Sequence, residues 1–305
     1  MQDKETKPRK KLNVAVCLAE VTDPEGPLRA DAAGVITAPG GGGGGFRLDA
    51  RSEFALEIAL RLKRSFPETT VHAVTLGPAR SESVLRRALA AGADAALRVW
   101  DASFDAPTPL FTARALAAAL KRLRPDAVLC GSRTTDSGTG LVGPALAAAL
   151  DLPFLGDVSD LHVAPAAASA LAACRRRGAT LTFECPLPAL FSVEHGKNCP
   201  PAPLRSIIRA GREKIPALDR EDLKLSPDWT DAPGPGARVV KLTAPKPKDK
   251  RGLGVPENLP PRDRLAGILT GGLSGKKHGI RLEGAAPVNI EKLFEWLAGE
   301  GIIQR

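Results

Sequence analysis

The residues with the clearest chemical meaning form a short polar segment, rich in glycine, serine and threonine, at positions 131–144. It reads G-S-R-T-T-D-S-G-T-G-L-V-G-P and lies between two apolar runs, at 127–130 and 146–150. This order predicts a buried strand, a loop and the first turn of a helix. Backbone N–H groups and the positive end of the helix dipole then meet at one point, where a phosphate can bind without a lysine. The segment therefore predicts a site for a nucleotide phosphate.

Individual residues of the segment fit that role. Gly138, Gly140 and Gly143 allow the chain to approach a ligand closely, and Ser137 and Thr139 provide hydroxyl donors. The alternative is an ordinary turn between a strand and a helix, with Thr139 as the N-cap. The spacing is neither that of a Walker A loop nor that of a G-x-G-x-x-G fingerprint, so the segment alone does not decide between the two interpretations.

The elements around this segment alternate between strands and helices. Apolar patterns predict strands at 12–18, 71–76, 95–99 and 127–130, and helices at 52–63, 81–91 and 112–123. This alternation predicts an α/β fold, with a doubly wound, mostly parallel sheet of the Rossmann-like type that binds adenine nucleotides. Ligands of such sheets bind at the carboxyl ends of the strands, where the turns at Gly77 and Gly131 lie.

The pattern changes after Pro153. Short antiparallel strands are expected at 158–163, 170–175, 180–184 and 189–193. Residues 195–203 are rich in Pro, Asn and Gly, which predicts an exposed loop.

The predicted domain covers residues 12–215, and the two ends of the chain and one glycine run are expected to differ from its regular structure. The basic start at 1–11 is expected to be disordered, and the six glycines at 40–45 to form a flexible surface loop. Residues 216–305 are predicted to be a C-terminal arm, extended over 233–261, because proline and glycine are frequent there. Helical periodicity returns only at 290–297, and we expect this terminal helix to dock onto a partner chain.

The composition narrows the possible functions. The net charge of +9 raises nucleic acid, an anionic membrane or an acidic protein as partners, but the chain has no tyrosine and 4% aromatic residues. The stacking platform of a single-strand nucleic-acid binder is therefore missing, and we expect a solvated basic face. No run reaches the roughly 20 apolar residues that cross a bilayer, and the charged start lacks the apolar core of a signal peptide, so we expect a protein that is not embedded in a membrane.

The side chains of catalysis and metal binding show no suitable spacing. Five cysteines without a C-x-x-C pair indicate reduced thiols in the cytoplasm. The four histidines lack metal-ligand spacing and a nucleophile context. We therefore expect no metal site and no catalytic residue, so that nothing in these residues performs group chemistry by itself.

Seven motifs, taken in order, resemble the β subunit of electron transfer flavoproteins. They are CLAEVTD at 17–23 for the family's C-V-K-Q-V-P-D, EFALE with ALRLK at 53–63, VTLGP at 74–78, LRRALAAGAD at 85–94, the loop at 131–144, LPA at 187–189 and LRSIIRA at 204–210. The resemblance covers about residues 12–215. It implies a heterodimer with an α subunit that holds a redox-active FAD, and transfer of electrons from flavin-dependent dehydrogenases to a membrane-bound or soluble acceptor.

The resemblance also implies which residues bind. The β subunit's own pocket holds AMP in one branch of the family and a second FAD in the electron-bifurcating branch. The implied nucleotide contacts are Cys17, Asp49, Ala50, Arg51, Ser52, Leu76, Asp136, Ser137, Gly138, Thr139, Gly140, Leu141, Val142 and Gly143. Residues 195–210 match the family's recognition loop, so Leu204, with Ile207 and Ile208, is expected to bind the partner dehydrogenase.

Several positions depart from the family pattern. Ala19 stands where the family usually has lysine, and Leu141 replaces the glutamine of the loop, which removes two polar groups near the nucleotide and the flavin. The identity of the nucleotide, AMP or a second FAD, therefore stays open. A rival interpretation is a free-standing adenine-nucleotide sensor on the same type of sheet, which would need no α subunit.

Overall fold

The computed structural model describes residues 11–23, 29–30, 36–37, 45–104, 107–163, 168–176, 178–225, 259–269 and 286–299. The chain divides into two units, Met1–Ala244 and Pro245–Arg305. The expectations for the start at 1–11, the glycine run at 40–45 and the arm at 233–261 fall almost wholly outside the described residues.

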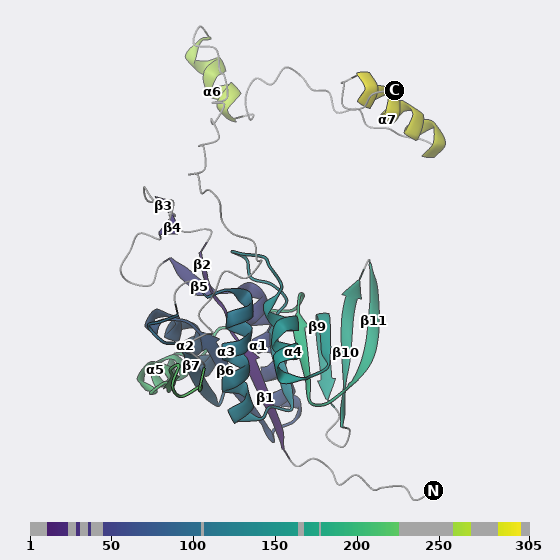
Figure 1. The fold of residues 1–305 in the computed structure, drawn as a ribbon. Helices are drawn as coiled ribbons and strands as arrows, with labels where there is room; N and C mark the ends of the chain where they lie inside the picture. Colours follow the sequence, from purple (N-terminus) through teal and green to yellow (C-terminus); the bar gives the residue numbers. More distant parts are fainter. Residues whose placement is uncertain are drawn as a thin grey trace, which may run out of the picture. The chain divides into compact units, whose positions relative to one another are not determined.

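The first unit is built on a sheet of nine strands (Figure 1). These strands are β1 (Leu12–Cys17), β6 (Thr69–Leu76), β7 (Ala95–Val99), β8 (Ala127–Gly131), β9 (Phe154–Val163), β10 (Ser169–Arg176), β11 (Ala179–Pro186), β12 (Ala189–Val193) and β13 (Ala217–Leu218). Their order is β11-β10-β9-β12-β8-β1-β6-β7-β13. Two short antiparallel pairs stand beside it, β2 (Glu20–Thr22) with β5 (Phe46–Leu48), and β3 (Arg29–Ala30) with β4 (Ile36–Thr37).

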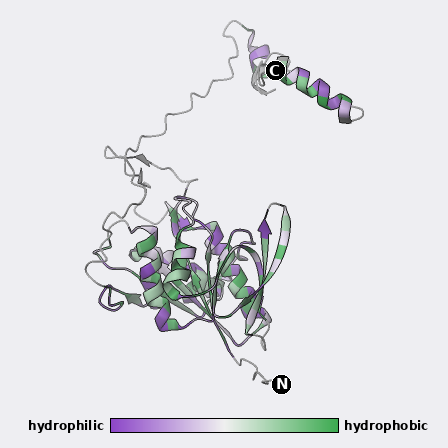
Figure 2. Cartoon of the chain, turned by 45° about the vertical axis from the view of Figure 1, so that its right-hand side comes forward, coloured by the Kyte–Doolittle hydropathy of each residue, from purple (hydrophilic) through white to green (hydrophobic). Residues whose placement is uncertain are grey.

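Helices cover both faces of the sheet. They are α1 (Ala50–Ser65), α2 (Glu82–Ala91), which follows the 3₁₀ turn η1 (Ala79–Ser81), α3 (Pro109–Leu123), α4 (Val142–Leu150) and α5 (Leu204–Arg212). Val14 and Val16 of β1 belong to the core that contains α1 and α2, whereas Ala15 and Cys17 belong to the core with α3 and α4. A strand buried on both faces is apolar on both, which explains the apolar run at 14–17 in β1. Figure 2 shows the hydrophobic colouring of these central strands.

The order of the strands creates a switch point between β1 and β8. The chain runs from β1 through α1 to β6 and through α2 to β7, on one side of β1. It then returns through α3 to β8, on the other side of β1, and the pairs β1–β6, β6–β7 and β1–β8 are all parallel. The loops after β1 and β8 therefore diverge and leave a crevice at their carboxyl ends, as in other doubly wound sheets.

The predicted α/β class and mostly parallel sheet are confirmed, and one strand direction is corrected. Strand β10 runs antiparallel to both of its neighbours, β9 and β11, as expected. The expectation of an antiparallel strand at 189–193 is wrong, because β12 lies between β9 and β8 and runs parallel to both. All five residues of β12 are buried, which suits a central position in a parallel sheet.

The compact body extends beyond residue 215, where the sequence analysis places the start of the arm. Ala217 and Leu218 form β13 and pair with β7 at the edge of the sheet. Leu223 and Leu225 are buried in the core that contains α3. The residues just after position 215 therefore help to close the side of the sheet.

The described part of the second unit consists of α6 (Pro261–Leu269) and α7 (Ala286–Gly299). Helix α7 contains the expected helical stretch at 290–297, and it alternates hydrophobic and hydrophilic colours in Figure 2. Its apolar residues Ile290, Leu293 and Phe294 are exposed. Among the described helices, none combines the length and the apolar character that a membrane span requires.

Candidate functional site

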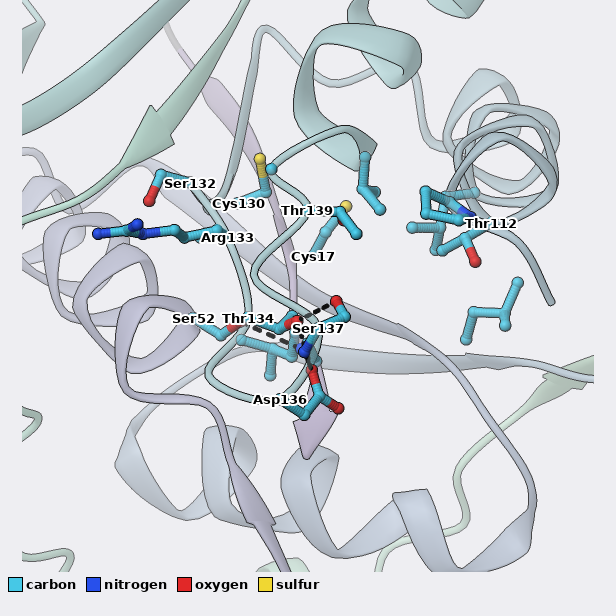
Figure 3. Close-up of a pocket in the computed structure, with 18 of the residues that line it drawn as sticks. Cys17, Ser52, Thr112, Cys130, Ser132, Arg133, Thr134, Asp136, Ser137 and Thr139 are labelled. Atoms are coloured by element: carbon cyan, nitrogen blue, oxygen red, sulfur yellow. Dashed lines mark hydrogen bonds between the residues drawn. The ribbon is translucent and has the colours of Figure 1, made fainter. Parts of the chain in front are cut away.

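A cavity of about 460 Å³ lies at the carboxyl ends of β1, β6 and β8. Its walls include Cys17 at the end of β1, Leu76 at the end of β6 and Cys130 in β8, together with Thr112 from the first turn of α3 (Figure 3). The volume falls within the range of small-molecule sites, roughly 300 to 1,000 Å³. The cavity therefore occupies the switch point of the sheet.

The structure divides the expected nucleotide contacts into two groups. The residues that line the cavity are Cys17, Ser52, Leu76, Asp136, Ser137, Thr139, Gly140 and Val142. The residues that lie around it without lining it are Asp49, Ala50, Arg51, Gly138, Leu141 and Gly143. Within the second group, Asp49, Arg51 and Gly143 hold the loop and α4 in place.

The loop after β8 leads directly into the uncapped start of α4. Gly138 and Gly140 have φ angles of 62° and 64°, which favour glycine because side chains rarely adopt this left-handed conformation. The N-cap of α4 is Leu141, whose side chain accepts no bond from the helix, so Thr139 is not the N-cap that the alternative interpretation requires. The first N–H groups of a helix have no intrahelical acceptor and are available to an anion at its positive end.

Of the other helices that begin at this edge, α1 and α3 are capped by side chains of the protein itself, whereas α2 has no side-chain cap. Asp49 accepts hydrogen bonds at the start of α1, and Thr108 accepts one from Phe111 at the start of α3. Among α1, α3 and α4, only α4 directs uncapped N–H groups to the wall of the cavity formed by Thr139, Gly140 and Val142. This end of the cavity is therefore the part most suited to a negative charge.

Gly143 allows α4 to pack closely against the end of β8. A Cβ atom at this position would lie 3.3 Å from Sγ of Cys130 and 3.4 Å from the ring of Phe154. A larger side chain would push α4 and its N–H groups away from the sheet. Gly143 thus acts by positioning the helix.

Asp49 is a buried brace between α1 and the loop. Its Oδ2 accepts from the backbone N–H groups of Arg51 at 2.9 Å and Ser52 at 3.3 Å. Its Oδ1 accepts from the backbone N–H of Thr135 at 2.8 Å and from the hydroxyl of the same residue. Asp49 is fully buried and does not line the cavity, so it acts by fixing the loop.

A second brace joins the loop to the end of β12. Glu194 accepts two hydrogen bonds from the guanidinium of Arg51, at 2.9 and 3.0 Å, and one from Arg133 at 2.9 Å. It also accepts from the hydroxyl of Ser132. Burial alone would raise the pKa of Glu194, but hydrogen bonds from Arg51, Ser132 and Arg133 outweigh it and lower the pKa to about 2. The carboxylate is therefore ionised at neutral pH and holds both arginines.

The polarity of the cavity changes from one end to the other. Burial raises the pKa of the Cys130 thiol to about 12, and it also raises the pKa of Cys17, so both thiols stay neutral and form an apolar wall. Oδ1 of Asp136 accepts from the Thr134 hydroxyl and from the N–H of Ser137, at the end of the loop away from Cys130 in Figure 3. A ligand phosphate is favoured near Thr139, where the carboxylate of Asp136 is distant.

Further residues line the cavity beyond the expected contacts. They are Leu18, Ala19, Glu20, Pro107, Pro109, Thr112, Leu116, Cys130, Gly131, Ser132, Arg133 and Thr134, of which residues 131–134 belong to the predicted phosphate-binding segment. Those from α3 could have been found, because Thr108 followed by Pro109 is a typical N-cap and N1 pattern, and it marks a helix start at the same edge of the sheet. The partnership of Glu194 and Arg51 has no local signal.

The expected partner-binding residues lie together on α5. Leu204 is 72% exposed at the start of this helix, and Ile207 and Ile208 are about half exposed. Residues 195–203 before it are irregular and mostly exposed, which confirms the predicted loop. Arg86 of α2 fixes the other end of α5 by donating to the carbonyls of Ala210, Gly211 and Glu213. Within the described residues, no group of three or more His, Cys, Asp and Glu side chains is arranged to hold a metal ion.

A comparison with protein families decides what kind of chain carries this site. The electron transfer flavoprotein domain matches residues 43–223, which is more than half of the sequence. The chain belongs to the electron transfer flavoprotein family. The matched region contains the loop after β8, the braces at Asp49 and Glu194, and α5.

Individual members of this flavoprotein family are similar to the chain in sequence over about two thirds of its length. The chain is 35% identical to Protein FixA of Azotobacter vinelandii, over 65% of its own length and 73% of that protein. It is 30% identical to the electron transfer flavoprotein subunit beta of Methylophilus methylotrophus, with 66% and 77% covered. It is also 30% identical to the caffeyl-CoA reductase-Etf complex subunit CarD of Acetobacterium woodii, with 64% and 74% covered. The relatives thus indicate the β-subunit branch of the family.

Proposed function

We propose that this protein is the β subunit of a heterodimeric electron transfer flavoprotein. In this function it pairs with an α subunit, and the two chains together hold the FAD that carries electrons from flavin-dependent dehydrogenases to a downstream acceptor. Bound flavin supplies the redox chemistry, and the protein places it and adjusts its surroundings. The β subunit is then a carrier subunit and not a complete enzyme. All five cysteines have free thiols, which supports a reducing compartment such as the cytoplasm.

The observation that carries the proposal is the cavity at the switch point, in a chain of this family. Its phosphate end combines the uncapped start of α4 with the hydroxyl of Thr139. Its walls also include the neutral thiols of Cys17 and Cys130, which suit the apolar parts of a ligand. These features fit an adenine nucleotide, either AMP or the adenine half of a second FAD.

Two further surfaces support a role in an assembly. The apolar side chains on α5, led by Leu204, are exposed on a helix whose far end is fixed by Arg86. We propose that this surface binds the dehydrogenase, since exposed apolar anchors contribute much of the energy of protein interfaces. The apolar residues of α7 are also exposed, and we propose that α7 docks onto the α subunit.

Coexpression with a candidate α subunit, from the same source, tests this proposal. We expect the two chains to purify as a heterodimer with the visible absorption of an oxidised flavin, and the colour to bleach when a flavin-dependent dehydrogenase and its substrate are added. Recovery of this chain alone, colourless and monodisperse, in the presence of the α subunit would contradict the proposal.

A free-standing adenine-nucleotide sensor is the second candidate. It is favoured by the fact that a single chain supplies the cavity walls on β1, β6, β8 and α3. Sedimentation of the chain with and without the α subunit separates the two functions, because a sensor stays monomeric and binds AMP equally well in both samples.

A further inference from the structure

Glu20 is an acidic residue in the wall of the cavity that the proposed function does not use. It begins β2, three residues after the end of β1, and its side chain is only 6% exposed. One carboxylate oxygen, Oε2, accepts from Oγ of Ser81 at 2.8 Å and from Nε of Arg80 at 3.0 Å. The other oxygen, Oε1, is buried and has no hydrogen-bond partner among the described residues.

A buried carboxylate oxygen without a donor is unfavourable, and native proteins contain few such atoms. The two bonds to Oε2 fix the carboxylate, so Oε1 cannot turn to Ser81 or Arg80 without losing them. Arg80 is itself held over the ring of Phe46, 4.2 Å from its centroid. The orphaned oxygen is therefore a prepared acceptor beside the cavity.

The chemistry of a carboxylate limits what can satisfy this atom. An ionised carboxylate only accepts hydrogen bonds, and it repels a phosphate. The group that binds here must be a donor, and it must lie at the opposite end of the ligand from the phosphate near α4. In a nucleotide, such donors are the ribose hydroxyls and the exocyclic amine of the base.

We propose that Oε1 of Glu20 accepts a hydrogen bond from the nucleoside part of a nucleotide, and thereby selects ligands with a donor at that position. This inference rests on the nucleotide binding proposed above. The phosphate lies at the uncapped start of α4 and the nucleoside donor at Glu20, so the two ends of the cavity recognise opposite ends of one ligand.

Calorimetric titration of the full chain, with its α subunit where the two copurify, tests this assignment with AMP as the probe. In Glu20→Gln, an amide oxygen can keep the contacts with Ser81 and Arg80 while an NH₂ group meets the ligand donor. We expect AMP to bind at least about tenfold more weakly, the effect of losing a hydrogen bond to a charged group. Glu68→Gln makes the same change at an exposed position before β6, and should bind AMP as the wild type does.

Three analogues identify the donor. Deoxyadenosine monophosphates that lack the 2′ or the 3′ hydroxyl remove one ribose donor each, and purine riboside monophosphate removes the amine. For one of them, the wild type should lose about as much affinity as Glu20→Gln loses for AMP, and the difference between the two proteins should disappear. Thermal unfolding of both variants without ligand should match the wild type, which separates recognition from folding.

The outcomes distinguish this inference from the proposed function. Equal AMP affinity of Glu20→Gln and the wild type would overturn the role of Glu20 and leave the nucleotide site intact. A loss of affinity that persists with every analogue would overturn it as well, because Glu20 would then act only on the structure. A wild-type protein that binds none of the nucleotides would overturn the nucleotide site itself, and the inference with it.

Discussion

Replacement of Asp49 by alanine tests whether the loop after β8 is held in place by a buried brace. The variant removes the side-chain cap of α1, which typically costs about 1 kcal/mol. It also removes the hydrogen bond from the backbone N–H of Thr135 to the carboxylate, which costs about 1 to 3 kcal/mol because the acceptor is charged. We therefore expect the free energy of unfolding to fall by about 2 to 4 kcal/mol, and AMP binding to weaken because the loop loses its anchor.

Urea unfolding, followed by circular dichroism and by tryptophan fluorescence, measures this change. Thr135→Val is the matched control, because it removes only the hydroxyl bond to Asp49 and keeps the backbone bond. It should cost about 1 kcal/mol and leave most of the AMP affinity. If Asp49→Ala were as stable as Thr135→Val and bound AMP equally well, the brace would not be what positions the loop.

Three other changes probe different parts of the account. In Gly143→Val, the new Cβ would lie 3.3 Å from Sγ of Cys130, and its two methyl groups would crowd the contact further. We expect the free energy of unfolding to fall by about 1 to 3 kcal/mol, and calorimetry to show an AMP affinity reduced more than tenfold. Leu204→Ala should change stability by less than about 0.5 kcal/mol because the residue is exposed, yet slow electron transfer from the dehydrogenase; an unchanged rate would argue against its role as an anchor. The pKa of Glu194 is about 2 instead of the ordinary 4.5. Its ion pairs therefore contribute fully to the free energy of unfolding above pH 4.5, and this contribution is lost as the pH falls toward 2. Glu194→Gln should remove that acid-dependent loss of stability, and a variant with the same pH profile as the wild type would show that the ion pair with Arg51 does not contribute.

The sequence predicted the elements of the first unit well because their signals are local. The helix expected at 81–91 ends at Gly92, whose φ of 123° terminates α2 in a conformation that suits glycine. The strand at 95–99 has the predicted bounds, and the apolar run at 127–130 extends by one residue to Gly131. Hydrophobic spacing and glycine positions are sufficient for such elements.

Strand direction and the roles of single side chains depend on contacts between distant residues. The apolar run at 189–193 suits a buried strand of either direction, and its pairing with β8 and β9 makes it parallel. The predicted contact of Asp49 with the nucleotide rests on its position alone, whereas its bond to Thr135, 86 residues away in the sequence, has no local signal. Glu194 and Arg51, separated by 143 residues, likewise have no local pattern that predicts their pairing.

The central claim is that the loop after β8 and the start of α4 bind the phosphate of an adenine nucleotide. The most direct test is to denature the purified protein, coexpressed with its α subunit, and to identify and quantify the nucleotides that are released. The account predicts an adenine nucleotide bound to the β subunit, as AMP or FAD, in addition to the FAD shared with the α subunit. Release of the shared FAD alone, together with no binding of added AMP or FAD, would contradict it.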